Sequence, residues 1–158
     1  MQITLTDTDV RILQLLQQDA SLSAASIAER IGLSQSPCWR RINRLEEAGL
    51  VKRRVAVLDA PKLGMQVTVF MTVNLSEHGR QSLAAFEEAV GDFPEVLECY
   101  TITGSMDYML KIVTRDIQHF ERFLRDHLSR LAGMREMHSY VAVTEIKCTT
   151  ELPLATQL

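Results

Sequence analysis

The chain has 158 residues, of which 46% are hydrophobic and 23% are charged, and its formal net charge at pH 7 is −3. These values argue against global disorder, and no apolar run approaches the roughly 20 residues that a membrane span needs. Residues 1–9 do not resemble a secretory signal, and the histidines and cysteines lack metal-ligand spacing. We expect a cytoplasmic protein without membrane contacts, metals or cofactors.

The first two predicted helices lie between Thr6 and Gly32. Thr6 is expected to cap the first helix, along which apolar residues recur at helical spacing as far as Leu16. Ser23 is expected to cap the second helix, and Gly32 supplies the left-handed residue that commonly ends one. Because a third helix follows after one further residue, this order predicts a helix-turn-helix.

The third predicted helix begins after Ser34 and ends near Gly49. Cys38, Ile42 and Leu45 have the spacing of a buried stripe. The rest of the helix offers hydroxyl, amide and guanidinium groups, which suit base edges and phosphates. The residues that we predict to contact DNA from this helix are Ser34, Gln35, Ser36, Trp39, Arg40, Arg41, Asn43 and Arg44.

A basic segment follows the third helix. Residues 50–59 are rich in β-branched side chains and predict a two-stranded wing or a single strand, in which Lys52, Arg53 and Arg54 contact the DNA backbone. Between residues 34 and 54, six basic residues stand against two acidic ones, a local charge of +4 in an acidic chain. The alternatives are a solvated helix face for the charge and an edge-strand guard for the three cations.

The pattern changes after a turn-rich linker at residues 59–64, which divides the chain into a winged helix-turn-helix domain, 1–58, and a second domain, 65–158. The second domain reads as strand, helix, strand, tight turn, strand, helix, strand. This order predicts an α+β, ferredoxin-like βαββαβ domain with both helices on one sheet face. The predicted elements are a strand at 65–75, a helix around 83–90, strands at 96–103 and 107–113, a helix at 117–131 and a strand at 140–146.

The second face of this predicted sheet has no segment of the chain left to cover it. An uncovered apolar sheet face is an association surface. We therefore expect a homodimer.

Three blocks of sequence resemble the Lrp/AsnC (leucine-responsive, feast/famine) family of transcription regulators, and its leucine-responsive branch most of all. The first block runs from Leu33 to Ile42, with Arg44-Leu45-Glu46 and Gly49-Leu50-Val51 after it. The other two are 96–111, which contains Gly104-Ser105-Met106-Asp107-Tyr108, and 140–147. Their order and spacing cover nearly the whole chain.

The resemblance implies dimers that pair through their sheets and assemble into octamers, and an amino-acid effector bound between subunits. It places the hairpin turn in the effector pocket, where Gly104 admits a ligand to backbone amides and Asp107 accepts hydrogen bonds from an ammonium group. The apolar walls favour leucine or methionine. The implied pocket residues are Thr103, Gly104, Met106, Asp107, Tyr108, Val141, Ala142, Val143 and Thr144.

Several alternatives stay open at this point. From the residues alone, Asp107 is better explained as a turn residue that caps its own backbone, and only the family resemblance favours the ligand role. Tyr108 is equally explained as a core residue. The domain order also fits a ferredoxin-like enzyme or a DNA-binding architectural protein without an effector, although no catalytic motif occurs. The preferred interpretation is a sequence-specific DNA-binding transcription regulator, not an enzyme, that responds to an amino acid.

Overall fold

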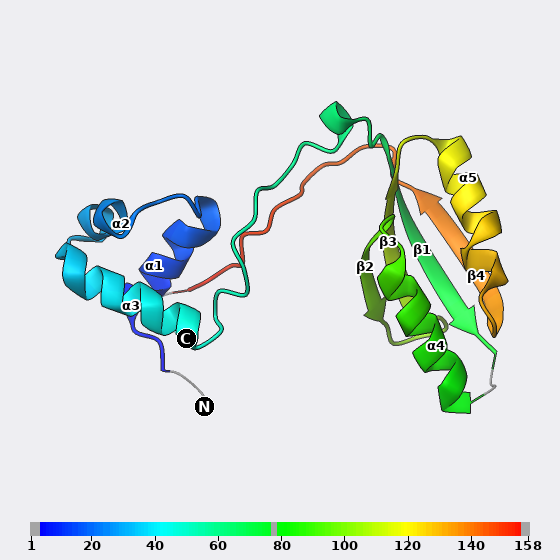
Figure 1. Cartoon of the computed structure of the whole chain (residues 1–158), viewed down its shortest axis with the longest axis horizontal. Coiled ribbons are helices and arrows are strands. Elements are labelled where there is room, and N and C mark those ends of the chain that lie inside the picture. The colour runs from blue at the N-terminus through cyan, green and yellow to red at the C-terminus, as the bar shows by residue number, and fades with distance from the viewer. Residues whose placement is uncertain (1–3, 77–78, 156–158) are drawn as a thin grey trace. The chain divides into compact units, whose positions relative to one another are not determined.

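The computed structural model describes residues 4–76 and 79–155. Its contacts divide the chain into two compact units, shown in Figure 1. The helical unit comprises residues 1–57 and 147–158, and the sheet unit comprises residues 58–146. In the part of the chain that the structure describes, no helix is long and apolar enough to cross a membrane.

The helical unit is built on three helices, α1 (Asp7–Gln18), α2 (Ala24–Ile31) and α3 (Gln35–Glu47). The predicted caps are present: the Thr6 hydroxyl accepts from the Asp9 amide at 3.3 Å, and the Ser23 hydroxyl accepts from the Ser26 amide at 3.1 Å. Gly32 ends α2 with φ 72°, a left-handed conformation that a side chain would strain. Local sequence signals therefore place all three helices.

One apolar cluster holds these helices together. Ile12 of α1, Ile27 of α2 and Leu45 of α3 are fully buried in it, as is Cys38. The predicted stripe of α3 thus faces the core, and the opposite side of α3 is left toward solvent.

The strand or two-stranded ribbon expected at residues 50–59 is not formed in this chain. Within the described residues, no strand lies between Gly49 and Val67, and the only regular element there is a short 3-10 helix, η1 (Pro61–Leu63). Val55 and Val57 are 61% and 79% exposed. β-branched composition favours a strand only where a second strand pairs with it, and an isolated hairpin is marginal in water.

The sheet unit has the predicted α+β, ferredoxin-like order. Its strands pair antiparallel in the order β2-β3-β1-β4, and Figure 1 shows both helices on one side of the sheet. The elements are β1 (Val67–Leu75), α4 (Gly79–Asp92), β2 (Val96–Thr101), β3 (Tyr108–Thr114), α5 (Ile117–Asp126), a 3-10 turn η2 (Leu128–Arg130) and β4 (Met134–Val141).

The core of this unit lies between the sheet and its two helices. Alternate residues of β1 face it, so that Val69, Met71 and Val73 are completely buried, and Phe86 of α4 and Phe120 of α5 close it from the other side. The alternation follows from the two-residue period of a strand.

The prediction placed the last strand at residues 140–146, too close to the C-terminus. β4 pairs with β1 from Met134 opposite Leu75 to Val141 opposite Val69, and the segment beyond it is exposed. This strand contains polar residues such as Arg135 and Glu136, so it does not show the hydrophobic pattern that predicts a strand. They are tolerated because β4 is an edge strand, with one side free of pairing.

The C-terminal tail belongs with the helices rather than with the sheet. Residues 147–155 group with the helical unit, and side chains of α1 bond the backbone of Leu152 and Leu154. The predicted division into 1–58, 59–64 and 65–158 stays a prediction of domain limits, and its last three residues lie outside the described part of the chain.

Candidate DNA-binding surface and effector site

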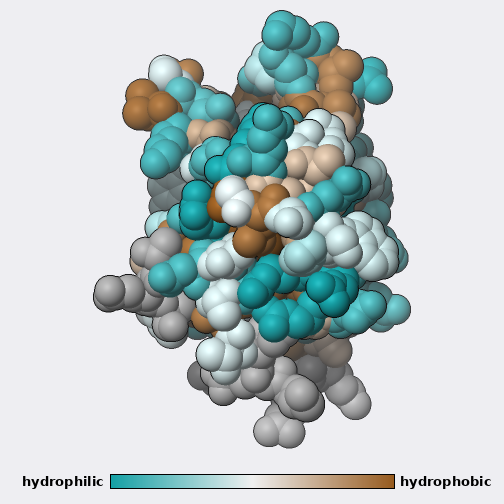
Figure 2. Space-filling model, turned by 90° about the vertical axis from the view of Figure 1, so that its left-hand side faces the viewer, coloured by the Kyte–Doolittle hydropathy of each residue, from teal (hydrophilic) through white to brown (hydrophobic). Residues whose placement is uncertain are grey.

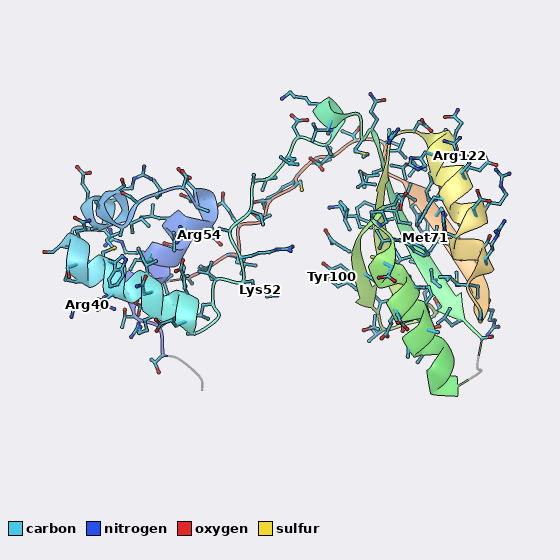
Figure 3. All side chains as sticks on the ribbon, in the orientation of Figure 1. Arg40, Lys52, Arg54, Met71, Tyr100 and Arg122 are labelled. Atoms are coloured by element: carbon cyan, nitrogen blue, oxygen red, sulfur yellow. The ribbon has the colours of Figure 1, made fainter. Side chains whose placement is uncertain are left out.

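The outer face of α3 carries the predicted DNA-contacting side chains. Gln35, Ser36 and Arg40 are exposed, Asn43 is half-buried, and Trp39 is 55% exposed. Ser34 precedes the helix without a side-chain capping bond, and it is exposed too. Figure 3 shows Arg40 directed away from the helices, and the face of the helical unit in Figure 2 is mainly hydrophilic.

Two of the predicted cations, Arg41 and Arg44, are already paired within the unit. The Arg41 Nη1 lies 3.0 Å from Asp9 Oδ1, and the Arg44 Nη2 lies 2.6 Å from Asp9 Oδ2. Asp9 is fully buried and also accepts from the amide and hydroxyl of Thr6, at 2.9 and 2.7 Å. This carboxylate therefore fixes α3 against the start of α1.

The electrostatics of Asp9 follow from these contacts. Burial raises the pKa of the Asp9 carboxyl, but the hydrogen bonds from Thr6 and Arg41 and the charge of Arg44 outweigh it and hold the pKa below its ordinary value. Asp9 is thus a carboxylate at neutral pH. From the sequence, Asp9 could be recognised only as an acidic residue in the first turn of a helix. Its arginine partners lie 32 and 35 positions away, so nothing near Asp9 in the sequence indicates the pairing.

In the basic segment after α3, one cation is likewise paired inside the unit and two are exposed. Arg54 is tied to the helices, since its Nη2 lies 2.6 Å from Glu46 Oε1 and its Nη1 donates to the Ala20 carbonyl at 2.9 Å. Lys52 and Arg53 are exposed, and among the described residues neither has an ion-pair partner. Figure 3 shows Lys52 extending from this segment. Arg40, Lys52 and Arg53 therefore remain available to an external anion.

The hairpin turn of the predicted effector pocket, residues 103–107, is hydrogen-bonded to β1. Asp107 Oδ2 accepts from the Leu75 amide at 2.7 Å, and the Asp107 amide donates to the Val73 carbonyl at 2.9 Å. The Asn74 side-chain amide donates to the Ser105 carbonyl at 2.6 Å. Gly104 has φ 121° and no atom within 4 Å of the position of a Cβ, so the turn leaves open space there. Thr103 is exposed, and Met106 is half-buried.

Tyr108 faces the core of its own chain. It is 3% exposed, its ring lies 4.7 Å from that of Phe86, and its hydroxyl donates to Glu87 Oε1 at 2.6 Å. Burial, and then the hydrogen bond and charge of Glu87, raise the pKa of Tyr108. In this position Tyr108 supports the hairpin from below.

A single chain does not bring the two halves of the predicted effector pocket together. The hairpin meets β1 at Val73, whereas the end of β4 meets it at Thr68, which accepts from the Ala142 amide at 2.9 Å. Five residues of strand separate these points by roughly 17 Å. Val141, Ala142, Val143 and Thr144 are all exposed, and Val143 is 96% exposed.

The sheet unit also has a hollow of about 500 Å³ beside its β2 edge. Glu87 of α4, Cys99 and Thr101 of β2, and Tyr108 of β3 contribute to its lining. Of the predicted effector residues, Tyr108 alone reaches it. No group of side chains in the described part of the chain has the arrangement of a metal site.

The sheet face away from the helices carries large apolar side chains. Cross-strand partners share a face, which places Tyr100 beside Met109 and Phe70 beside Tyr140. These four are between 37% and 58% exposed, and Figure 3 shows Tyr100 on the side of the sheet away from α5. An ion pair between Glu98 and Lys111, at 3.2 Å, lies among them. The face is therefore mixed, with aromatic side chains on β1, β2 and β4 and an ion pair between β2 and β3, and we call it the aromatic sheet face.

Comparison with known proteins identifies both units. Residues 5–52 match the model of a winged helix-turn-helix DNA-binding domain, and residues 68–152 match that of the Lrp/AsnC ligand binding domain. The chain belongs to the Lrp/AsnC family of transcriptional regulators. As a member of this family it is a DNA-binding transcription regulator with an amino-acid-binding domain, as the three sequence blocks predicted.

Relatives match this regulator along nearly its whole length. Transcriptional regulator AzlB of Bacillus subtilis is 40% identical over 98% of both chains, and the transcriptional activator DecR of Escherichia coli is 34% identical over 92% of this chain and 96% of its own. These relatives are regulators, which decides against the enzyme alternative.

Solved structures agree with the fold. The transcriptional regulator NMB0573 of Neisseria meningitidis, determined as a complex with L-methionine, superposes with a TM-score of 0.94 at 36% identity, over 98% of this chain and 100% of its own. An AsnC-family regulator of Agrobacterium tumefaciens has a TM-score of 0.92 at 41% identity, with the same coverage. The two-part architecture of this Lrp/AsnC chain is thus shared by these structures.

Proposed function

We propose that this Lrp/AsnC protein reads specific DNA sites with the outer face of α3 and changes its DNA binding when an apolar amino acid binds to the sheet unit. The observation that carries the first half is the division of cations described above. Arg40, Lys52 and Arg53 stay exposed, whereas internal carboxylates hold Arg41, Arg44 and Arg54.

The three exposed cations supply the attraction to phosphates, and Ser36, Arg40 and Asn43 supply groups for base edges. Arg41 and Arg44 act mainly by holding α3 in place. In a dimer, two α3 helices enter successive major grooves of a roughly palindromic site.

The effector half of the proposal needs more than one chain. Because the hairpin turn and the end of β4 lie roughly 17 Å apart along β1, a pocket that contains both is formed only when a second subunit contributes one of them. Leucine and methionine fit the apolar side chains nearby, among which Met134 lies opposite Leu75, next to the hairpin. The L-methionine bound to NMB0573 supports this chemical class.

The assembly follows from the same requirement. We propose a homodimer that pairs through the aromatic sheet face, and further assembly of dimers to octamers, in the cytoplasm. Burial of Phe70, Tyr100 and Tyr140 is the driving force, and Glu98 and Lys111 already neutralise each other on that face.

The sensor half is tested by a thermal-shift panel of the common amino acids on the parent protein and on Asp107→Ala. A ligand that binds only the folded state stabilises it by about 2.7 kcal/mol at a hundred times its Kd. We expect leucine or methionine to raise the Tm of the parent and not that of the variant. If no amino acid raises the Tm of the parent, the sensor half is wrong.

The DNA half is tested separately with Arg40→Ala and a duplex selected by the parent protein from a random pool. Loss of a base-contacting arginine weakens binding by about 1–3 kcal/mol, or roughly 5- to 150-fold. The subunit assembly, measured by light scattering, should not change. Dissociation of the variant would show that Arg40 belongs to a subunit contact instead.

A further inference from the structure

The chain leaves the sheet unit after β4 and returns to α1. Residues 142–150 are exposed throughout, with Val143 and Ile146 at 96% and 90%. The backbone is then held again at residues 151–154, which we call the strap. Figure 1 shows the C-terminal segment, in red, at the three helices.

Two glutamines of α1 bind the strap through its backbone. Gln17 engages both polar groups of Leu152, since the Leu152 amide donates to its Oε1 at 2.9 Å and its Nε2 donates to the Leu152 carbonyl at 3.0 Å. Gln14 Nε2 donates to the Leu154 carbonyl at 2.9 Å. A side-chain amide that pairs with an amide and a carbonyl of one residue acts as a neighbouring strand does. Residues three apart on a helix present both glutamines to the same side.

The strap has a defined local shape. The Leu154 amide donates back to the Leu152 carbonyl at 2.8 Å, which makes a γ-turn centred on Pro153. Proline suits this position because it has no amide to leave unpaired and its φ is fixed. The strap therefore loses less conformational entropy on docking than a flexible segment would.

The docked strap and the helices line an open hollow of about 450 Å³. Leu15 and Ile31 supply its apolar wall, and Leu154 is half-buried. Arg11 and Arg30 line the same hollow as Glu151 of the strap, so the charges of the two partners are complementary.

This docking gives the two units a second connection. The chain passes from one unit to the other after residue 57 and again after residue 146. The helix that holds the strap also carries Asp9, the carboxylate that fixes Arg41 and Arg44 of α3. A change at the end of β4 can therefore reach the DNA-reading helix through the strap and α1, independently of the linker.

We propose that the strap is the element through which the sheet unit controls DNA reading: docked on Gln14 and Gln17 it holds the helical unit in one state, and its release permits another. The effector has a different affinity for the two states, which is what such coupling requires. This inference rests on the proposed function, because it names the route by which the effector signal travels.

Docking itself is tested by amide hydrogen exchange on the full chain. The Leu152 amide is expected to exchange at least about tenfold more slowly in the parent than in Gln17→Ala, because only a closed hydrogen bond protects it. Gln18→Ala is the matched control, since Gln18 lines the same hollow without a hydrogen bond to the strap in the described residues. Exchange in the parent at the rate of a free peptide would overturn the proposal.

Coupling is tested with the double variant Gln14→Ala/Gln17→Ala, using the selected duplex and either L-leucine or L-methionine. We expect the amino acid to raise the Tm of the variant as it does in the parent, while its effect on DNA affinity falls at least fivefold, on the order of 1 kcal/mol of coupling. An unchanged effect on DNA affinity in the variant would overturn the strap and leave the proposed function intact. A parent whose DNA affinity responds to no amino acid would overturn the proposed sensor, and the strap with it.

Discussion

The outer face of α3 and the hairpin turn between β2 and β3 were both predicted to bind a ligand, and they differ in how complete they are within one chain. On α3, the Asp9 carboxylate pairs with two of the arginines, while Ser36 and Arg40 are exposed. In the hairpin, Asp107 already bonds the Leu75 amide, and Tyr108 is buried beneath the turn.

One chain is enough to form the DNA-binding surface, whereas the proposed effector site needs two. The helical unit presents its DNA surface from local structure, because the caps, the stripe and the exposed face of α3 all follow from helical periodicity. The effector site as proposed joins the hairpin to residues beyond β4, which one chain holds roughly 17 Å away. Each of the following changes tests that contrast.

The largest expected effect comes from Phe70→Glu on the aromatic sheet face. Position 70 lies opposite Lys111, which Glu98 already neutralises, so the variant adds an unbalanced carboxylate to a subunit contact. Its burial weakens dimerisation by on the order of 3 kcal/mol, or more than 100-fold in Kd. Leu83→Glu is the matched control, because Leu83 lies on α4 and is 39% exposed, against 41% for Phe70. Light scattering should show monomers for Phe70→Glu alone, and these monomers should fail to bind the amino acid. Amino-acid binding by a monomer would contradict the claim that the effector site needs two subunits.

The next effect is expected from Asp9→Asn. Loss of the charge that holds two guanidinium groups lowers the free energy of unfolding by about 1–2 kcal/mol at pH 7, a value reduced because both arginines are partly exposed. Asp7→Asn, in the same helical turn but at an exposed position, should change it little. Urea denaturation measures both.

The pH dependence of this effect has a definite sign. Because the folded pKa of Asp9 lies below its unfolded value, its contribution is complete above about pH 4 and is lost as the pH falls through the folded pKa. The stability of Asp9→Asn should therefore approach that of the parent in acid. A difference that persists unchanged at low pH would mean that Asp9 acts by packing rather than by charge.

Much of the fold could be predicted from the sequence because its signals are local. Thr6, Ser23 and Gly32 mark helix ends by their own chemistry, and the alternation along β1 marks a strand with one buried face. The failures share a cause. The bounds of β4 were wrong because an edge strand tolerates polar residues. The strand expected at residues 50–59 is absent because strand pairing needs a second segment that composition does not show.

The candidate sites were predicted less well, because their geometry depends on long-range partners. Arg41 and Arg44 are basic residues on the expected helix, and nothing near them in the sequence indicates that Asp9 pairs with both. The bond from Leu75 to Asp107 spans 32 positions, and those from α1 to the strap span 135 and 140. Such contacts are read from the folded chain alone.

A smaller effect separates the two roles of Asp107. Asp107→Asn keeps a side-chain oxygen that can accept from the Leu75 amide, whereas Asp107→Ala leaves that amide without its acceptor and lowers the free energy of unfolding by about 1 kcal/mol. If Asp107 also binds the ammonium group of the effector, the Asn variant should be stable and still show no rise in Tm with leucine or methionine. An Asn variant that responds like the parent would make Asp107 a structural clasp only.

The smallest effect is expected in the basic segment after α3, where neighbouring arginines have different surroundings. Arg53 is exposed, and Arg54 is bonded to Glu46 and to the Ala20 carbonyl. Each phosphate contact contributes about one to the slope of log Kd against log salt concentration, so Arg53→Ala should reduce that slope by about one. Arg54→Ala should leave the slope nearly unchanged, because its charge is already neutralised by Glu46. Equal slopes for both variants would show that the Arg54–Glu46 pair opens when DNA binds. In that case both arginines of this segment would contact phosphate, unlike on α3, where Asp9 holds some of the cations inside the unit.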